Sequence, residues 1–473
     1  MIEFTLERNK IRLKCNDFES IREHFSVKDE TARFRLKGRS RFAAPSRVYC
    51  ITPTGLFDYG LFYDILAYIK QERPNDQITV STGISEIVKP GLKQCRLYDN
   101  LTHELRDYQI QSINQALNYG RGVLKMGTGA GKTLTIASLL MSVYASNKSF
   151  KCLIIVPDLS LVNQTYSDFE EYNVLFKSTR WTGKIKPDLT SNVIIANLGI
   201  LQSRFNDYDF LKYVDILVID ECHKLKKSNK INKIVESITT NNKFGLTGTL
   251  PDNKIDEWNI LGKLGNVIYD KDSHSLREEN YLTNVNVSFL NIKYKTKPKY
   301  DKASNNYRVE LDFIYSNEFR NNVIKNICGK FNNNSLVLVN HLVHGDALYD
   351  KLVKYSDKQV FFVKGEMEVE VRDKIKSIME VNNNVICIAM SSIFSTGINI
   401  KNIHMIIFAS GGKSFVRTIQ SIGRGLRLHG DKDKLVIIDI VDNLKYGKRH
   451  AEKRQDIYKL EKINYKSTEI VEI

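Results

Sequence analysis

The sequence predicts an α/β protein that consists of two parallel-sheet domains in tandem and a small α+β domain at the N-terminus. From Leu101 onward, short apolar runs alternate with segments of helical periodicity, which is typical of a parallel sheet covered by helices. A second alternating run begins near Val285, after a polar connector at about residues 270–283. The residues before the first run lack this alternation. We therefore expect domains at residues 1–95, 96–275 and 276–473.

The composition is that of a folded, basic protein. With 473 residues, of which 42% are hydrophobic, the chain is too long for a single core. No apolar run approaches the length of a membrane span and the first residues lack an apolar signal core, so we expect a cytoplasmic protein without a membrane partner. Seven scattered cysteines without a CxxC pair predict reduced thiols rather than disulfides or a zinc site. The net charge of +16 favours a polyanionic partner, most often nucleic acid.

The predicted N-terminal domain carries no nucleotide motif but contains a cationic segment. Glu3–Leu13 and Val48–Ile51 predict strands, and Leu61–Lys70 predicts an amphipathic helix. Between them lies a basic run without an acidic residue: Arg33, Arg35, Lys37, Arg39, Arg41 and Arg47. The first five alternate, so on a strand they would share one face and could neutralise several phosphates of DNA or RNA. The alternative is a solvated edge strand whose charges only prevent aggregation.

A glycine-rich turn stands between a short apolar strand, Gly122–Met126, and a segment of helical periodicity. The turn consists of Gly127, Thr128, Gly129, Ala130 and Gly131. Its N–H groups and the helix N-terminus can bind the phosphates of ATP, Lys132 can reach the β- and γ-phosphates, and the Thr133 hydroxyl can hold Mg²⁺. Met126 stands where the strict pattern has glycine. An ordinary glycine turn before a core helix is the alternative.

Further polar groups flank strands of the same predicted sheet. Asp220 and Glu221 follow an apolar strand, where Asp220 suits Mg²⁺ binding and Glu221 suits the orientation and deprotonation of a water molecule. The amide of Gln109 can donate to and accept from the edge of adenine, and Arg106 could stack on the base. After another short strand, the hydroxyls of Thr247 and Thr249 can relay a change in hydrogen bonding from the nucleotide.

The predicted second domain has no glycine-rich turn before a lysine, but two of its segments carry candidate residues. Its expected strands are Ser335–Val339, Val360–Val363, Val385–Ala389, Met405–Phe408 and Leu435–Ile438. Thr396 and Gly397 follow a strand and can offer donors to a phosphate or a ribose. Arg424 and Arg427 lie three residues apart after Gln420, so on a helical turn they would point the same way, as suits a γ-phosphoryl group in transfer. The alternative is a basic helix face.

The sequence is compatible with two roles for each of two segments in this second half. Residues 294–308 are rich in Lys, Tyr and Asn and could contact nucleic acid or form a solvated loop. Residues 441–473, with the basic helical stretch Lys445–Lys462, could bind DNA or brace the second domain.

The order of these motifs over about residues 101–440 resembles that of the superfamily 2 helicases and translocases. The resemblance implies two RecA-like domains with ATP and Mg²⁺ in the cleft between them and nucleic acid across both. It implies that Gln109 selects adenine, that His223 and Thr247 couple the ATP and nucleic-acid sites, and that Arg424 and Arg427 reach across the cleft.

A narrower resemblance links the chain to the UvsW-type phage helicases. It rests on Phe394–Ile398, the turn Gly412–Ser414, the stretch Gln420–Arg424 and the small basic N-terminal domain. It implies an ATP-dependent helicase that unwinds or branch-migrates forked and junction DNA in replication, recombination and repair, with ATP and water as its only small-molecule substrates. A phage-encoded chain would act in the host cytoplasm. Asn399 stands where many relatives carry Asp.

Three other functions remain as alternatives. The nearest is an RNA helicase or an RNA-stimulated ATPase, although Asp220-Glu221-Cys222-His223, unlike Asp-Glu-Ala-Asp, favours DNA over RNA remodelling. A restriction-system motor subunit would need a partner that carries the nuclease. A non-catalytic binding module is disfavoured because the basic and acidic residues of the candidate site are intact.

Overall fold

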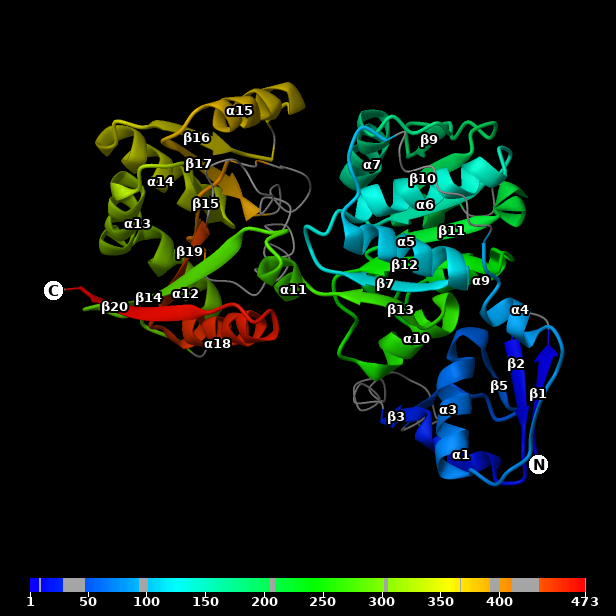
Figure 1. Cartoon of the computed structure of the whole chain (residues 1–473). Coiled ribbons are helices and arrows are strands. Elements are labelled where there is room, and N and C mark those ends of the chain that lie inside the picture. The colour runs from blue at the N-terminus through cyan, green and yellow to red at the C-terminus, as the bar shows by residue number, and fades with distance from the viewer. Residues whose placement is uncertain are drawn as a thin grey trace. The chain divides into compact units, whose positions relative to one another are not determined.

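The computed structural model describes residues 1–7, 10–28, 47–92, 101–204, 209–301, 305–365, 367–391, 400, 402–410 and 434–472. They form two compact units, Met1–Asp272 and Ser273–Ile473 (Figure 1). Within the described ranges, no helix is both long enough and apolar enough to cross a membrane.

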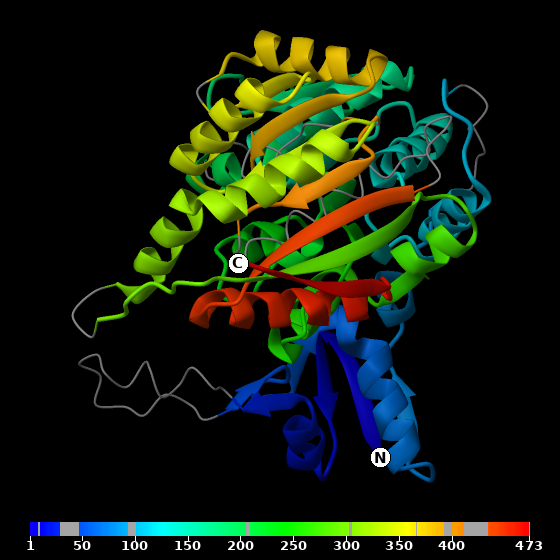
Figure 2. The same cartoon turned by 90° about the vertical axis from the view of Figure 1, so that its left-hand side faces the viewer.

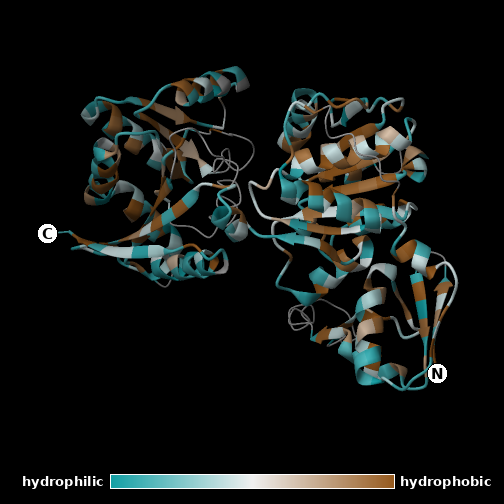
Figure 3. Ribbon diagram, viewed as in Figure 1, coloured by the Kyte–Doolittle hydropathy of each residue, from teal (hydrophilic) through white to brown (hydrophobic). Residues whose placement is uncertain are grey.

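A seven-stranded parallel sheet forms the centre of the first unit, in the strand order β13-β7-β12-β11-β8-β10-β9. Its strands are β7 (Gly122–Met126), β8 (Cys152–Val156), β9 (Ser178–Trp181), β10 (Val193–Asn197), β11 (Ile216–Asp220), β12 (Asn242–Thr247) and β13 (Val267–Lys271). Helices α5 (Asp107–Tyr119), α6 (Lys132–Ser146), α7 (Leu159–Glu171), α8 (Leu198–Arg204), α9 (Ile231–Ser237) and α10 (Lys254–Leu264) accompany it. The neighbouring strands β8, β10 and β11 are apolar at nearly every position, because a parallel sheet is covered on both faces, and the sheet is largely brown in Figure 3.

The N-terminal part of this unit is a smaller α+β layer. A four-stranded sheet has the order β5-β2-β1-β6, and β3 pairs with β4. The elements are β1 (Ile2–Glu7), β2 (Lys10–Lys14), α1 (Phe18–His24), β3 (Ser26–Lys28), β4 (Arg47–Tyr49), β5 (Leu56–Asp58), α3 (Phe62–Glu72), β6 (Ile78–Val80) and α4 (Ile84–Val88). The amphipathic helix expected at Leu61–Lys70 is confirmed as α3, whose buried face holds Phe62, Ile65 and Ile69.

The prediction of one strand at Glu3–Leu13 is wrong, because these residues form two antiparallel strands with Glu7 opposite Lys10. The physical reason lies in the positions of the buried residues. Ile2 and Phe4 are buried in β1, whereas Ile11 and Leu13 are buried in β2. Even and odd positions would face opposite sides of a single strand, so only a reversal of the chain places all four in one core.

The N-terminal layer and the large sheet share one hydrophobic core. A Cβ at Gly60 would lie 2.0 Å from the carbonyl oxygen of Leu261, so only glycine permits this contact with α10. The buried Arg121 guanidinium lies 4.1 Å from the centre of the Tyr59 ring and donates to the carbonyl oxygens of Lys263 (2.9 Å) and Leu264 (3.2 Å). These contacts fasten the N-terminal layer to α10.

The second unit contains another seven-stranded parallel sheet, in the order β16-β17-β15-β18-β19-β14-β20. In Figure 2 the edge strand β20 is drawn in red, and its neighbour β14 is drawn in green. The strands are β14 (Asn284–Lys293), β15 (Ser335–Val339), β16 (Gln359–Val363), β17 (Val385–Met390), β18 (Met405–Phe408), β19 (Lys434–Asp442) and β20 (Tyr465–Val471). All five strands expected in this half are therefore confirmed. The helices are α11 (Ser273–Glu278), α12 (Asn306–Ser316), α13 (Glu318–Lys330), α14 (Leu342–Tyr355), α15 (Val369–Val381) and α18 (Lys445–Leu460).

The two segments with an open role both contribute to the packing of the second unit. In residues 294–308, the Tyr294 hydroxyl donates to Asp442 inside the core, and the Tyr300 hydroxyl lies 2.7 Å from a carboxylate oxygen of Glu310. Near the C-terminus, Arg454 of α18 pairs with the fully buried Asp439 of β19 at 2.7 Å. The strand β20 then extends the sheet beside β14. Helix α18 and strand β20 therefore brace the second unit.

Candidate nucleotide-binding site

The glycine-rich turn lies at the carboxyl edge of the first sheet, between β7 and α6. Gly129 and Gly131 have φ angles of +86° and +74°, in the left-handed region that favours glycine. A Cβ at Gly131 would lie 2.4 Å from Nε2 of Gln109, so a larger residue has no room there. Lys132 is the first residue of α6, which places its N–H and that of Thr133 at the helix N-terminus.

The acidic residues reach the same edge, because β11 and β12 follow β7 in the sheet. Glu221, directly after β11, lies with its Oε1 3.4 Å from Nζ of Lys132. Asp220, the last residue of β11, accepts the Glu221 N–H at 2.9 Å. Glu221 has a φ of +51°, an uncommon backbone conformation for a side chain of this kind. Such strain costs about 1–3 kcal/mol and is typical of functional sites.

His223 and Thr247 continue this line of contacts away from the turn. Nδ1 of His223 lies 3.2 Å from Oε2 of Glu221 and 2.9 Å from the Thr247 hydroxyl. The Thr247 hydroxyl donates to the carbonyl oxygen of Thr249 at 2.8 Å. Because the Thr247 hydroxyl donates its only hydrogen to Thr249, it can only accept a hydrogen bond from His223. The hydrogen of this bond is therefore on Nδ1 of the imidazole. Contacts therefore run without a gap from Lys132 to Thr249.

Cys222 anchors the acidic pair in the core below. Its thiol is fully buried, and burial, with the neighbouring Glu221 and Asp220 carboxylates, raises its pKa well above the usual range. A Cβ at Gly245 of β12 would lie 2.8 Å from its sulfur. Cys222 is thus a packing residue that fixes the turn after β11, and it stays a neutral thiol.

The structure places Gln109 beneath the glycine-rich turn. Its side chain is 3% exposed, its Oε1 accepts the Arg106 N–H at 3.0 Å, and its Nε2 donates to the Ala130 carbonyl oxygen at 3.0 Å. The hydroxyl of Tyr108 donates to the same oxygen at 3.0 Å, and the Arg106 guanidinium lies 3.2 Å from that hydroxyl. In this structure Gln109 therefore positions the turn, and its contact with adenine stays a prediction.

Sequence reasoning missed two contributors to this geometry. Tyr108 gave a weak signal, because it stands in the same pentapeptide as Gln109. Lys271, the last residue of β13, accepts the Gly127 N–H with its carbonyl oxygen at 2.9 Å. A backbone contact between residues so far apart in the chain leaves no trace in the sequence.

The remaining predicted site residues lie mostly outside the described residues. These are Thr396, Gly397, Gln420, Arg424, Arg427, Arg33, Arg35, Lys37, Arg39 and Arg41. Arg47 is described, and its Nε lies 3.1 Å from a Glu23 carboxylate oxygen and 2.8 Å from the Ser26 hydroxyl. It joins α1, β3 and β4, and its predicted phosphate contact stays a prediction.

The residues at this edge fit Mg-ATP. The turn has two glycines with positive φ before the N-terminus of α6, and Lys132 supplies a cation that is only 12% exposed. Within the described ranges, no group of three or more His, Cys, Asp or Glu side chains could hold a metal ion. Thr133 and Asp220 would therefore hold Mg²⁺ only together with phosphate oxygens, as is common for this ion.

Comparisons with known proteins agree with this fold. Residues 102–252 match the family model of the type III restriction enzyme res subunit, and residues 319–429 match the helicase conserved C-terminal domain. The chain is 28% identical to the ATP-dependent DNA helicase uvsW of Enterobacteria phage T4 over 96% of both chains. It is 26% identical to the putative ATP-dependent helicase IRC3 of Saccharomyces cerevisiae, over 71% of this chain and 51% of that protein.

Solved structures show the same fold. A fragment of a putative HsdR subunit of a type I restriction enzyme from Vibrio vulnificus aligns with a TM-score of 0.57 and 17% identity, over 86% of this chain and 74% of that one. The restriction-enzyme model and the helicase model therefore match in order along a chain with two parallel sheets, and Lys132 and Glu221 lie together in the first unit. The chain therefore carries a helicase conserved C-terminal domain and is similar, along almost its whole length, to the UvsW helicase of phage T4.

Proposed function

We propose that the chain is an ATP-dependent DNA helicase that unwinds or branch-migrates forked and junction DNA. The observation that carries this proposal is the unbroken line of contacts from Lys132 through Glu221 and His223 to Thr247. This line joins the groups that would hold phosphate to Thr247 at the end of β12. A change in the bound nucleotide could therefore alter the hydrogen bonds at the end of that strand. The similarity to a DNA helicase along almost the whole chain supports DNA as the partner.

In this proposal each group of the site has a step in ATP hydrolysis. When bound, Mg²⁺ supplies positive charge to the phosphate oxygens, with Thr133 and Asp220 as its protein ligands. Without nucleotide, Lys132 neutralises Glu221. An incoming γ-phosphate attracts the Lys132 ammonium, which leaves Glu221 Oε1 free to orient a water molecule and accept its proton.

His223 then carries the change away from the nucleotide. Its Nδ1–H is shared between Glu221 and Thr247 in the nucleotide-free site. Protonation of Glu221 weakens its pull on this hydrogen, so the imidazole turns toward Thr247. The resemblance to the helicases gives Arg424 and Arg427 the role of stabilising the charge that develops on the γ-phosphoryl group, a role that the two guanidinium groups suit chemically.

The basic N-terminal segment provides the preference for branched DNA. Arg33, Arg35, Lys37, Arg39 and Arg41 would contact duplex phosphates close to a junction. Because the N-terminal layer is fastened to α10, a duplex held there stays at a fixed place on the first unit. In this role the chain works in the cytoplasm, within the host cell if a phage encodes it.

Unwinding of model junctions tests the proposal. A labelled four-way junction and a forked duplex are incubated with the chain and Mg-ATP, and the products are separated on a native gel. Strand separation that needs ATP and is lost in Glu221→Gln is expected. A chain that hydrolyses ATP but leaves both substrates intact, while it separates an RNA duplex, would contradict the DNA assignment.

A further inference from the structure

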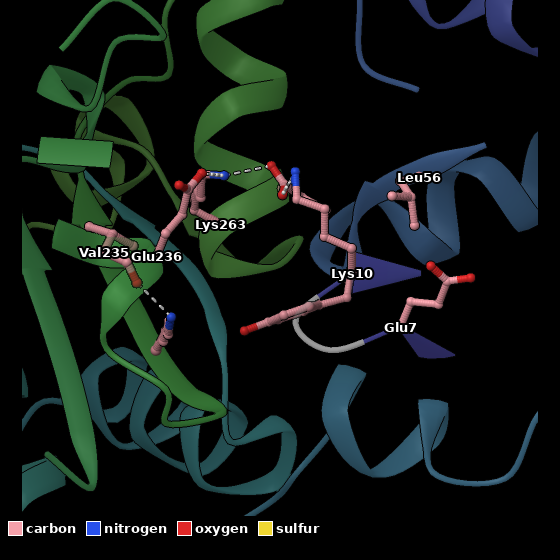
Figure 4. A pocket seen from close by; sticks show the side chains of 10 residues that line it. Glu7, Lys10, Leu56, Val235, Glu236 and Lys263 are labelled. Carbon is pink, nitrogen blue, oxygen red and sulfur yellow. Dashed lines mark hydrogen bonds and ion pairs between the residues drawn. The ribbon is translucent and has the colours of Figure 1, made fainter. Parts of the chain in front are cut away.

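A cavity of about 670 Å³ lies between the N-terminal layer and the large sheet of the first unit, away from the glycine-rich turn. Figure 4 shows Lys10, Glu7 and Leu56 on the side of the N-terminal layer, and Lys263, Glu236 and Val235 on the opposite side. This volume lies within the range of pockets that bind small organic molecules. Neither the candidate nucleotide-binding site nor the line of contacts from Lys132 to Thr249 contributes a residue to its lining.

The carboxylates that line the cavity already have cationic partners. Glu7 is held by the Arg12 guanidinium, whose Nη2 donates to Oε2 of Glu7 at 2.7 Å. Asp58 lies 2.8 Å from Nζ of Lys263 and 3.4 Å from Nζ of Lys10. Burial opposes the ionisation of Asp58, yet Lys263 and Lys10 hold its pKa below the usual range. Lys263 also reaches Glu236 at 2.5 Å (Figure 4). A cationic ligand would therefore find no free carboxylate among the described lining residues.

Lys243, on β12, is the exception among the charged groups of the lining. It is 4% exposed, and its Nζ donates to the carbonyl oxygen of Val235 at 2.8 Å, without a carboxylate among the described residues within ion-pair distance. Burial, with repulsion from Arg121 and Lys263, lowers the pKa of Lys243 to about 7. An ammonium group has three hydrogen-bond donors, so this side chain can still serve an acceptor in the cavity.

The apolar residues of the lining complete the recognition chemistry. Leu56, Tyr59 and Val235 offer hydrocarbon and aromatic surface beside the charged groups. We propose that the cavity binds a small organic anion, whose acidic group pairs with Lys243 and whose apolar part packs against Leu56 and Tyr59. Such a ligand sits between the N-terminal layer and α10, and it adds a binding site that is separate from the ATP and nucleic-acid sites.

Isothermal titration of the full chain with 8-anilinonaphthalene-1-sulfonate, an aromatic anion of suitable size, tests this site. ADP at saturating concentration keeps the nucleotide site filled. One probe molecule is expected to bind per chain, and Lys243→Met, which keeps the length of the side chain and removes its charge, is expected to weaken binding at least tenfold. The matched control is Lys212→Met, because Lys212 is an exposed lysine remote from the cavity lining. Displacement by inorganic phosphate or by benzoate then identifies which acidic group the cavity prefers.

Proton uptake provides a second readout. At pH 8 most Lys243 side chains are neutral, because the pKa is about 7, so an anion that pairs with Lys243 draws a proton from the buffer. Titrations in two buffers of different ionisation enthalpy are expected to show this uptake in the wild type and its absence in Lys243→Met. Leu56→Trp, which narrows the cavity beside Tyr59 but keeps the lysine, is expected to weaken binding. Absent binding, or binding that Lys243→Met leaves unchanged, would overturn the proposal.

Discussion

Lys132 Nζ lies 3.4 Å from Oε1 of Glu221, so the cation expected to hold the γ-phosphate also neutralises the carboxylate expected to activate water. The pair is mostly shielded from solvent, with side chains 12% and 20% exposed. In the proposed function, a nucleotide would have to separate the two groups before Glu221 could act as a base. This arrangement links catalysis to occupancy of the phosphate site.

Glu221→Gln is expected to abolish turnover while ATP still binds. The amide keeps the shape of the side chain but cannot accept the proton of water. The loss of general-base catalysis is expected to lower kcat about 10²- to 10⁴-fold. Steady-state ATPase assays and binding of a fluorescent ATP analogue measure the two effects. Lys132→Ala is expected to reduce both, because it removes the phosphate contact as well. Equal losses of binding in both variants would contradict the division of roles.

Thr247→Val is expected to uncouple ATP hydrolysis from DNA. The substitution preserves the shape of this fully buried side chain and removes the hydroxyl that accepts from His223. Coupling between two sites is typically worth about 1–3 kcal/mol, so stimulation of the ATPase by DNA should fall about fivefold or more. The rate without DNA serves as the internal control and should change little. Parallel losses with and without DNA would point to a purely structural role.

Tyr108→Phe is expected to raise the KM for ATP. It removes one of two hydrogen bonds to the Ala130 carbonyl oxygen, each worth about 1 kcal/mol, and leaves the packing intact. Gln109→Ala should raise the KM further, because Ala130 and Arg106 both lose a partner. Rates with GTP beside ATP then separate the two roles of Gln109. Lost preference for ATP indicates contact with adenine, and an unchanged preference indicates positioning alone.

Arg320→Met is expected to destabilise the second unit strongly. Arg320 is fully buried and lies with its Nε 2.7 Å from an oxygen of the equally buried Asp442, and it also donates to the Ala409 carbonyl oxygen at 2.6 Å. Removal of the cation leaves a buried carboxylate without its ion-pair partner, which typically costs about 3–5 kcal/mol. Urea unfolding of the full chain measures this. Lys177→Met is the matched control, since its pair with Asp188 is exposed and should leave the midpoint nearly unchanged.

Lys243→Met is expected to change how stability depends on pH. The pKa of Lys243 is about 7 in the folded chain and lies near 10.4 in an unfolded one, so the unfolded chain binds more protons between these values. The free energy of unfolding of the wild type should therefore rise, relative to the variant, as the pH increases from about 7 to about 10. Denaturant titrations at several pH values check this. A constant difference between the two proteins would contradict a depressed pKa.

The sequence was sufficient for the sheets and for the glycine-rich turn before α6, because both depend on local pattern. Runs such as Cys152–Val156 are apolar at every position, as strands buried on both faces must be, and they match the observed strands. The turn at Gly127–Gly131 is equally local. The prediction at Glu3–Leu13 failed because only the switch of the buried positions from even numbers in β1 to odd numbers in β2 marks the reversal of the chain.

Contacts between distant residues could not be predicted. The pairing of Asp58 with Lys263 joins residues 205 positions apart, and neither side chain stands out in its own segment. The same holds for Lys243, whose burial follows from the packing of the N-terminal layer on the large sheet. A single sequence shows which residue types are present, whereas the partner of each buried charge follows from the three-dimensional fold.

The ATPase rate with and without nucleic acid tests the central claim most directly. The full chain is assayed alone and with single-stranded, duplex, forked and four-way DNA and with a matched RNA, with Glu221→Gln as the background. Strong stimulation by forked or four-way DNA and little by RNA is predicted. Equal or greater stimulation by RNA would contradict a DNA motor, and the absence of hydrolysis with every nucleic acid would contradict the catalytic assignment itself.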